Sequence, residues 1–536
     1  MTGGVCQIGA RCEGELDQSV RQVTFNPGVS LRDILNTSAL RVRSACNGLG
    51  ACGLCRIRID SGDGGRVTDA ERLHLDEATL AEGVRLACQV IPATSLDVTV
   101  LCQARPTPWR SPLLTPYRPA YALAPVGGRQ RLGIAVDLGT TTITLAACDL
   151  GSGRRLAVRS APNPQLDISS DVVGRLHRAA TAPGEGRLLK TLVESAIRDG
   201  LRDLSRGEGL PLRFVERLRI VGNTAMLILL AGADPRPLLL PSGWNRPAGQ
   251  EMAPPAGLAE ALELNADTDI ALVPALGGFV GSDLALGVVH TRLTDLEPPA
   301  MLIDFGTNSE MGLWDGRTLW ISAAAGGPAF EGVGIGCGVA AGPGAVQRLR
   351  RDENGGWLAD TIDNVPPTGL CGSGLIDLLG ELRACGDLDA VGRPRVSPLE
   401  IPVRDRRFTI GKADLDKLQR AKAAIGAGLE TLCRLAEVPV DGLATVLLAG
   451  AFGDSLGFAN AMRIGLLPAL PPERFRMAGN AALAGALDLL LSPAAEDNLA
   501  AIRRLARLVN LSMVPHFDEV FMDHLFLRPM GDGGVP

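Results

Sequence analysis

Four cysteines near the start of the chain have the spacing of an iron–sulfur ligand set. Five residues separate Cys46 from Cys52, two separate Cys52 from Cys55, and Cys88 follows Cys55 by 33 positions. The residues between the first three are rich in glycine, so this loop can fold tightly around an inorganic core and point backbone N–H groups at its sulfurs. Four thiolates from one loop and one distant position are typical of a plant-type [2Fe-2S] cluster, whose first gap usually has four residues.

A zinc site and four unrelated buried cysteines are the alternatives for this pattern. A four-cysteine zinc site usually has two Cys-x-x-Cys pairs, and this segment has only the pair Cys52 and Cys55. The sequence therefore predicts one [2Fe-2S] cluster. Its predicted ligands are Cys46, Cys52, Cys55 and Cys88.

A glycine turn after an apolar strand could hold phosphate. Asp137 ends the apolar run 134–136 and is followed by Gly139, Thr140 and Thr141. Backbone N–H groups and hydroxyls in such a turn can bind phosphate oxygens, while the carboxylate holds a hydrated Mg²⁺ or orients a water molecule. This pattern indicates a nucleotide site.

The same pattern returns in the second half of the chain. Asp304, Gly306 and Thr307 follow another apolar run, and Asp304 lies 167 positions after Asp137. One Asp-x-Gly-Thr motif is a weak signal, whereas two at corresponding places favour a duplicated architecture.

A third glycine turn follows the apolar run 446–449. Gly450 and Gly453 there could let a flat ligand such as adenine approach the backbone closely. In this order the three turns resemble the phosphate-1, phosphate-2 and adenosine motifs of the superfamily of actin, sugar kinases and heat-shock chaperone ATPases. Three ordinary connections between strand and turn are the alternative.

The elements around the cysteines predict a compact β-grasp domain over residues 1–102. Alternation predicts strands at 22–26, 55–59 and 96–101, and apolar spacing predicts helices at 31–35 and 70–80. The sequence thus predicts an α/β multidomain protein, in which a β-grasp [2Fe-2S] ferredoxin domain precedes a duplicated, ribonuclease-H-like core of the actin-like ATPase type.

Prolines recur through residues 103–130, which we expect to form a semi-stiff linker that lets the redox domain sample several positions. The ATPase domain is expected over 131–536, with lobes of approximately 131–300 and 301–536. Its first elements should be a strand, turn and strand over 131–149, repeated at 301–313.

The composition of the chain argues against some kinds of partner. The chain has 536 residues, a net charge of −6 and 4% aromatic residues, which argues against a nucleic-acid partner. It has neither a secretion signal at its start nor an apolar run of about 18 residues. We expect a cytoplasmic protein without a membrane partner.

A ferredoxin with a five-residue first gap, joined by a Pro-rich linker to this ATPase fold, resembles the reductive activators of corrinoid-dependent enzymes. The resemblance covers nearly the whole chain and includes the stretches 163–166, 171–175, 222–224, 278–283, 324–332 and 371–377. Longer members carry an extra domain after the linker, and some end in further cysteine-rich motifs. Here the linker leads straight to the strand before Asp137, and no cysteine follows Cys433.

The resemblance implies ATP-dependent transfer of one electron from the [2Fe-2S] cluster to a Co(II) corrinoid protein, which restores Co(I) for methyl transfer. A potential gap of about 200 mV, at about 59 mV per factor of ten, would cost roughly 5 kcal/mol, which a nucleotide-driven change could offset. The implied partners are a corrinoid protein of a methyltransferase system and an upstream electron donor, and a homodimer is allowed.

The resemblance also implies residue roles. Asp137 and Asp304 would handle Mg²⁺ and the attacking water, and Ser322 is a candidate for reaching the cobalt environment. Asp283 would either line the nucleotide cleft or cap a turn. The implied nucleotide contacts are Gly139, Thr140, Thr141, Gly306, Thr307, Gly450 and Gly453.

Two other functions fit parts of the pattern. An activator of a radical dehydratase would share the ATPase fold but usually holds a [4Fe-4S] cluster between subunits. A redox- and nucleotide-sensing adaptor would bind nucleotide without turnover. A plain sugar kinase is disfavoured, because it has no use for the four cysteines.

Overall fold

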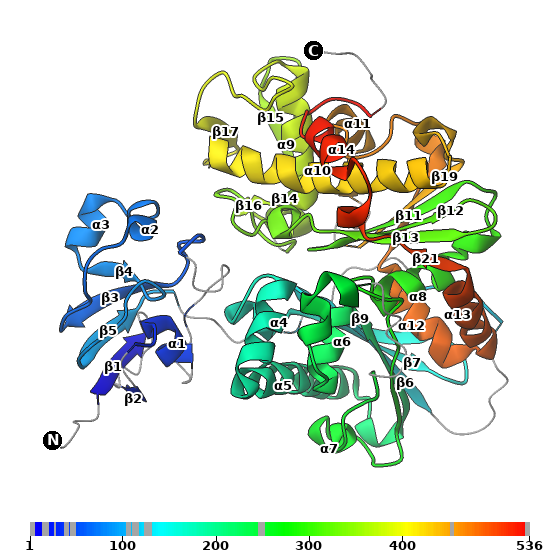
Figure 1. Ribbon diagram of the computed structural model, residues 1–536, viewed down its shortest axis with the longest axis horizontal. Coiled ribbons are helices and arrows are strands. Elements are labelled where there is room, and N and C mark those ends of the chain that lie inside the picture. Colours follow the sequence, from blue (N-terminus) through cyan, green and yellow to red (C-terminus); the bar gives the residue numbers. More distant parts are fainter. Residues whose placement is uncertain are drawn as a thin grey trace. The chain divides into compact units, whose positions relative to one another are not determined.

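The computed structural model describes residues 6–12, 21–25, 28–36, 42, 50–102, 109, 117–122, 131–244, 252–342, 344–450 and 455–530 (Figure 1). The chain divides into two compact units. One consists of residues 1–108 and 162–178, and the other of residues 109–161 and 179–536. Each unit is described by itself.

The N-terminal unit is built on a mixed five-stranded sheet in the order β2-β1-β5-β3-β4. Its strands are β1 (Cys6–Cys12), β2 (Arg21–Phe25), β3 (Arg56–Ser61), β4 (Val84–Leu86) and β5 (Leu96–Val100), and its short helices are α1 (Leu31–Asn36), α2 (Asp69–Arg72) and α3 (Glu77–Ala81). The inward side chains of these elements form one buried core, which includes Ile8, Leu35, Ile57 and Val98. The predicted ferredoxin-like fold is confirmed.

The single helix predicted over residues 70–80 is wrong, because two helix starts lie within it. Thr68 caps α2 in a capping box with Glu71, and Asp76 caps α3 by accepting a hydrogen bond from the backbone of Thr79. An N-cap residue has extended backbone angles, so Asp76 interrupts any helix that would run through it.

Two sheets of similar order form the centre of the second unit. The first has the order β10-β9-β6-β7-β8, and the second has the order β20-β19-β11-β12-β13-β21. The strands of the first sheet are β6 (Leu132–Leu138), β7 (Thr142–Asp149), β8 (Arg155–Pro162), β9 (Val215–Gly222) and β10 (Asp269–Leu272). Those of the second are β11 (Ala300–Phe305), β12 (Ser309–Trp314), β13 (Leu319–Ala324), β19 (Thr445–Gly450), β20 (Phe475–Gly479) and β21 (Ala506–Leu508).

In each sheet the first strand of an antiparallel hairpin, β6 in one and β11 in the other, also pairs with one parallel strand, which is β9 or β19. A further parallel strand, β10 or β20, pairs with that strand in turn. The predicted duplication is therefore confirmed, as are the strand pairs predicted over 131–149 and 301–313.

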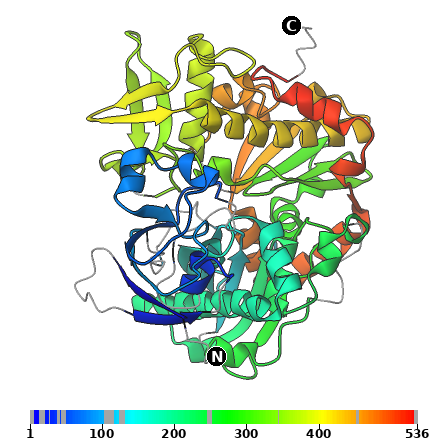
Figure 2. The ribbon, with the colours of Figure 1, turned by 60° about the vertical axis from the view of Figure 1, so that its left-hand side comes forward.

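Helices α5 (Pro183–Glu208), α6 (Thr224–Ala231), α8 (Ser282–Thr291), α10 (Lys412–Leu435) and α12 (Ala481–Leu491) contact the two sheets. The other helices of this unit are α7 (Leu258–Ala261), α9 (Gly372–Ala384), α11 (Phe458–Arg463), α13 (Pro493–Leu505) and α14 (Phe517–His524). Most of α4 (Val172–Thr181) belongs to the segment 162–178, which is part of the first unit. Small sheets of β14 (Ala345–Arg351), β15 (Trp357–Thr361) and β16 (Gly369–Leu370), and of β17 (Leu399–Val403) and β18 (Arg406–Ile410), accompany α9 and α10. Figures 1 and 2 show the long α10 with α14 beside it.

Helix α12, near the C-terminal end of the ATPase core, contacts elements of the first half of that core. Helix α12 is apolar nearly all round and packs against α8, β6 and β9 of the first half. The approach to α8 is close, since a Cβ on Gly485 would lie 2.2 Å from the carbonyl oxygen of Leu286. A helix with this composition must be buried on all sides, which explains its return to the first sheet.

Part of the predicted linker is held by the second unit. The Tyr117 hydroxyl donates to Asp488 on α12 at 2.8 Å, and the Ala120 backbone donates to the same carboxylate at 3.1 Å. The Tyr121 hydroxyl donates to the carbonyl of Val289 on α8 at 2.9 Å. Tyr117, Ala120 and Tyr121, which lie within the predicted linker 103–130, are therefore held by α12 and α8.

Among the helices of the described ranges, none combines the length and apolar character needed to cross a membrane.

Candidate functional site

Three of the four predicted cluster ligands lie in the described chain, and Cys46 lies outside it. Cys55 precedes β3 and Cys88 follows β4, and the backbone of Ala87 donates to the carbonyl of Cys55 at 2.8 Å. A hydrogen bond with Cys88, burial and the nearby thiol of Cys52 raise the pKa of Cys55 above its ordinary value. The Cys55 thiol therefore favours its protonated form unless a cation such as iron replaces the proton.

The pairing of Cys55 and Cys88 suits a two-iron centre. Within the ranges the structure describes, no group of three His, Cys, Asp or Glu side chains is placed to hold a single metal ion. A [2Fe-2S] cluster has no such need, because its four thiolates divide two to each iron. The contacting pair therefore fits one iron, and its donor chemistry fits the cluster.

The loop before β3 requires glycine where it packs against the next helix. Gly50 and Gly53 have φ angles of +72° and +65°. A Cβ on Gly53 would lie 2.8 Å from the ring of His74, and one on Gly50 would lie 2.7 Å from the Cβ of Ala70. Positive φ and close contact both exclude other side chains, so these glycines fix the path of the cysteine loop.

A buried ion pair supports the same region. Arg85 donates to both carboxylate oxygens of Glu71, at 2.8 and 2.9 Å, and the Leu86 backbone donates to Glu71 at 3.0 Å. Burial works to raise the pKa of Glu71, but these bonds and one from Thr68 hold it below its ordinary value. The pair connects α2 to β4, directly before Cys88.

In the second unit, the predicted residues Asp137 and Asp304 occupy corresponding places near the ends of β6 and β11. Asn480, the N-cap of α12, donates through Nδ2 to Asp137 at 2.8 Å. This contact was not predicted, because Asn480 is 343 positions away in sequence. It shows that α12 helps to position the first carboxylate.

Four carboxyl groups influence one another at this place. Burial raises the pKa of Asp137 to about 6. Burial and the nearby Asp137 raise the pKa of Asp283 to about 7, and burial with Asp283 and Asp137 raises that of Asp304 to about 8. Burial, Asp283 and Asp304 raise the pKa of Glu310 well above its ordinary value. The cluster holds protons near neutral pH unless a cation replaces them.

Sequence reasoning missed Glu310, although the hairpin register gives a signal for it. Glu310 on β12 is the direct partner of Asp304 on β11, and Asn223 donates to it at 3.2 Å. Asp283 accepts a hydrogen bond from the backbone of Leu284 at 2.9 Å at the start of α8. Asp283 thus lies in the first turn of α8, whose N-cap is Gly281, and also lies within the carboxyl cluster.

The predicted threonines join the two glycine turns. The Thr141 and Thr307 hydroxyl oxygens are 2.6 Å apart, and Thr307 lies 2.9 and 3.0 Å from the carboxylate oxygens of Glu331. Thr140, which precedes Thr141 in the chain, has a buried side chain. The chain therefore brings the hydroxyls of both halves together.

Glycine is required in these turns by close approach. Gly450 has a φ of +92°, and a Cβ there would lie 2.3 Å from a carboxylate oxygen of Asp304. A Cβ on Gly139 would lie 2.6 Å from the carbonyl oxygen of Thr142, and one on Gly306 would lie 3.1 Å from that of Asn308. Gly453, the other residue predicted on the adenosine side, lies outside the described residues.

Ser322, the candidate for reaching the cobalt environment, is buried. Its side chain on β13 is 1% exposed, and its hydroxyl donates to the carbonyl of Val509 at 2.8 Å. The hydroxyl thus joins β13 to the segment after β21. The role of Ser322 near the cobalt stays a prediction.

Comparisons with known proteins agree with both units. Residues 15–93 match the family model of the 2Fe-2S iron-sulfur cluster binding domain, residues 132–295 that of the RACo middle region, and residues 298–533 that of the C-terminal domain of RACo, the ASKHA domain.

Two relatives and one solved structure match over most of their length. The corrinoid activation enzyme RamQ of Eubacterium limosum is 27% identical over 417 residues, which are 73% of this chain and 69% of the relative. The [Co(II) methylated amine-specific corrinoid protein] reductase of Methanosarcina barkeri is 25% identical over 407 residues, which are 69% and 72% of the two chains. The structure of a reductive activator for corrinoid, iron-sulfur protein is 25% identical and superposes with a TM-score of 0.66, covering 97% of this chain and 98% of that one.

Proposed function

Since the chain belongs to the RACo family, with matches over 132–295 and 298–533, we propose that it is an ATP-dependent reductive activator of a corrinoid protein. The observation that carries the proposal is the presence of two sites in one chain. One unit places the thiols of Cys55 and Cys88 in contact. In the other unit, Thr141 and Thr307 join the two glycine turns proposed to bind phosphate, which are called the phosphate turns.

We also propose that the protein acts in the cytoplasm.

The cysteine site supplies the redox chemistry. We propose that Cys46, Cys52, Cys55 and Cys88 hold the cluster in the 2Fe-2S domain at residues 15–93. When bound, a [2Fe-2S] cluster supplies one electron at a time, which is the stoichiometry for converting Co(II) of a corrinoid to Co(I). An upstream electron-transfer protein must replace each electron that leaves.

The carboxyl cluster supplies a place for a hydrated Mg²⁺ with ATP. Asp137 and Asp304 would orient the water shell of the ion. Because burial and the neighbouring Asp283 and Asp137 raise the pKa of Asp304 to about 8, Mg²⁺ would displace a proton from Asp304 as it binds at neutral pH. The phosphates would lie against the turns that carry Thr140, Thr141 and Thr307.

Gly450 would serve the adenosine side of the same site. The backbone of Gly450 lies so close to Asp304 that no side chain would fit between them. Gly450 also pairs with Phe305 in the adjacent parallel strands β19 and β11. Nucleotide contacts on β11 and β19 would therefore move together. We propose that this movement is how ATP changes the protein's hold on its corrinoid partner.

ATP turnover in the presence of the partner tests this function. The full chain should hydrolyse ATP slowly, and a Co(II) corrinoid protein should increase the rate at least tenfold. Asp304→Asn should abolish this increase. A chain that binds ATP but shows no turnover with any Co(II) corrinoid protein of its methyltransferase system would instead be a sensing adaptor.

A further inference from the structure

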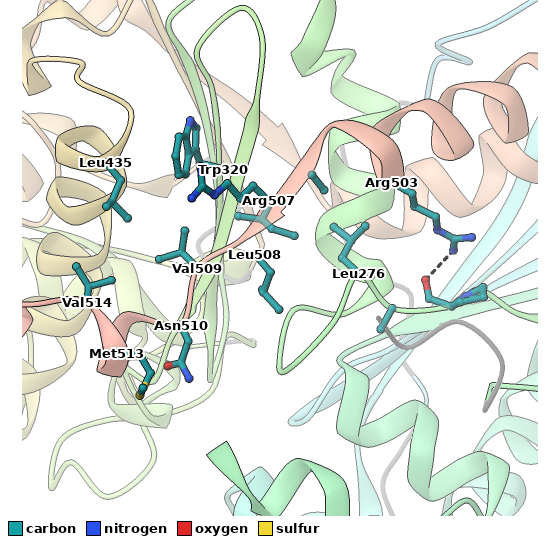
Figure 3. Close-up of a pocket in the computed structure, with 14 residues that line it drawn as sticks. Leu276, Trp320, Leu435, Arg503, Arg507, Leu508, Val509, Asn510, Met513 and Val514 are labelled. Carbon is teal, nitrogen blue, oxygen red and sulfur yellow. Dashed lines mark hydrogen bonds between the residues drawn. The ribbon is translucent and has the colours of Figure 1, made fainter. Parts of the chain in front are cut away.

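A groove lies beside β21, on the second unit of the chain (Figure 3). Its volume is about 620 Å³. Its lining residues, which define the β21 groove, are 274–276, Trp320, Ile321, Leu435, Arg503, 506–510, Met513 and Val514. None of them contributes to the carboxyl cluster or to the phosphate turns, so the proposed function leaves this groove unused.

One wall of the groove is the edge of a sheet. Strand β21 pairs in parallel with β13 and is the last strand of the six-stranded sheet. Val509 donates its backbone N–H inward to Ile321 at 2.8 Å. Because alternate residues of a strand face opposite sides, the N–H and C=O groups of Leu508 face away from β13. An edge of this kind can accept a further strand.

The charge of the groove has one sign. Arg503 and Arg507 are exposed in its lining, and the described lining contains no carboxylate. The guanidinium of Arg507 lies 4.6 Å from the ring centre of Trp320. Arg503 donates to the carbonyl of Pro274 at 2.8 Å, which uses one of its five donors among the described contacts. Acidic groups would be bound here, although the chain as a whole has a net charge of −6.

The rim of the groove is apolar. Met513 is 70% exposed and Leu435 is 36% exposed, and Figure 3 shows Leu276 and Leu508 on facing sides of the hollow. Methionine adapts its shape to different contacts and is common on binding surfaces. Exposed apolar side chains around a basic edge favour a protein segment over a small anion, which would leave the rim uncovered.

Asn510 adds a polar anchor at the same wall. Its Nδ2 has no hydrogen-bond acceptor in the described chain, while its Oδ1 accepts from the backbone of Ser512 at 3.2 Å. A buried donor without an acceptor costs free energy. A carbonyl or carboxylate that entered the groove could satisfy it after a small rotation.

We propose that the β21 groove binds an extended segment of a partner protein, in which acidic side chains alternate with apolar ones, as an additional strand on β21. Acidic side chains would meet Arg503 and Arg507, and apolar side chains would cover Leu435 and Met513. The inference does not rest on nucleotide or corrinoid chemistry, and its test can fail while the proposed function holds.

Peptide selection on the full chain tests the proposal. The probe is a phage-displayed library of random ten-residue peptides, selected on the wild type and on the double variant Arg503→Glu, Arg507→Glu. We expect enriched peptides with alternating acidic and apolar residues on the wild type only. A synthetic, fluorescein-labelled peptide of that set should bind the double variant at least tenfold more weakly, as measured by anisotropy.

Arg504→Glu is the matched control, because Arg504 is an exposed neighbour on α13 that does not line the groove. It should bind the peptide within twofold of the wild type. Arg507→Met keeps an apolar stem over Trp320 without the charge and should weaken binding at least fivefold. Equal thermal unfolding midpoints would show that the variants are folded. If the double variant does not fold, the peptide affinity of Arg507→Met tests the proposal instead.

Backbone methylation tests the added strand. Two versions of the peptide carry N-methyl groups on its odd or its even amides, and one should lose at least tenfold in affinity while the other keeps it. Equal affinities of the two versions, or enrichment of basic peptides, would overturn the proposal. The proposal would also be overturned if the wild type enriched no peptides beyond those that the double variant enriches. A wild-type dimer that the double variant converts to monomer would assign the groove to a second copy instead.

Discussion

The hydroxyl oxygen of Thr141 lies 2.6 Å from that of Thr307, so one hydrogen bond joins the turns that follow the first strands of the two sheets. Thr307 also lies 2.9 Å from a carboxylate oxygen of Glu331. A hydroxyl carries one proton, so Thr307 donates to Glu331 and accepts from Thr141. Phosphate oxygens that enter between the turns would compete for the same donor.

Removing the Thr307 hydroxyl should therefore damage nucleotide handling. Thr307→Val keeps the shape of the side chain but leaves Thr141 and Glu331 without this partner, a loss of about 1–3 kcal/mol per unsatisfied group. We expect ATP hydrolysis to fall about tenfold to a hundredfold. Thr307→Ser retains the hydroxyl and should stay within about threefold of the wild type. Equal rates for the valine and serine variants would remove Thr307 from the phosphate site.

The carboxyl cluster should make stability depend on pH. Burial raises the pKa of Asp304 to about 8 and burial near Asp137 raises that of Asp283 to about 7, above the ordinary value of 3.8. The folded state therefore holds protons that the unfolded state has lost. This contribution is complete below about pH 4 and disappears as the pH rises through 7 and 8.

The nucleotide-free protein should accordingly lose stability as the pH rises from about 4 to about 8. Asp304→Asn cannot ionise and should lose less over the same range, so the difference between the two unfolding midpoints should grow with pH. Thermal unfolding without nucleotide or divalent cations measures this. Parallel curves for wild type and variant would contradict the assignment of the raised pKa to Asp304.

The cysteine site should be separable from the nucleotide site. Cys52→Ser or Cys88→Ser should lower the iron content and remove the visible absorption of the cluster, while ATP affinity stays within about twofold. Cys102→Ser, which changes a thiol outside the predicted ligand set, is the control and should keep the full absorption. Retention of a complete cluster in Cys88→Ser would show that the ligands were assigned wrongly.

The ion pair of Glu71 and Arg85 should stabilise the N-terminal unit. Arg85→Met leaves a buried carboxylate without its partner, which costs about 3–5 kcal/mol. The cluster absorption should then be lost at a temperature well below that of the wild type. Arg58→Met breaks a pair with Asp60 that is 3.3 Å long and partly exposed, which is worth at most about 1 kcal/mol. Similar melting of the two variants would contradict the role of Glu71.

Local patterns in the sequence predicted the parts of the fold that local chemistry determines. The cysteine spacing and the two Asp-x-Gly-Thr turns need only neighbouring residues, and both led to the confirmed fold. The residues that sequence reasoning missed reach the site from other elements of the fold. Glu310 joins the carboxyl cluster through the pairing of β12 with β11, and Asn480 reaches Asp137 from a C-terminal helix that returns to the first sheet.

The same reason explains why the sequence did not reveal the contacts of the linker and of Ser322. Proline content indicates an irregular backbone but not what that backbone contacts, and Tyr117 is held by Asp488 from 371 positions away. Ser322 lies on β13 near the glycine-rich stretch 324–332, and its hydroxyl donates to the carbonyl of Val509. In both cases the hydrogen-bond partner comes from a distant part of the chain.

The formation of Co(I) tests the central claim most directly. Reduced full-length protein is mixed with a Co(II) corrinoid protein, with and without Mg-ATP, and the Co(I) absorption is followed. We predict that Co(I) appears with Mg-ATP, that it fails to appear without nucleotide or with Asp304→Asn, and that Cys52→Ser abolishes it. Co(I) formation that proceeds equally well without ATP, or that survives Cys52→Ser, would contradict the account.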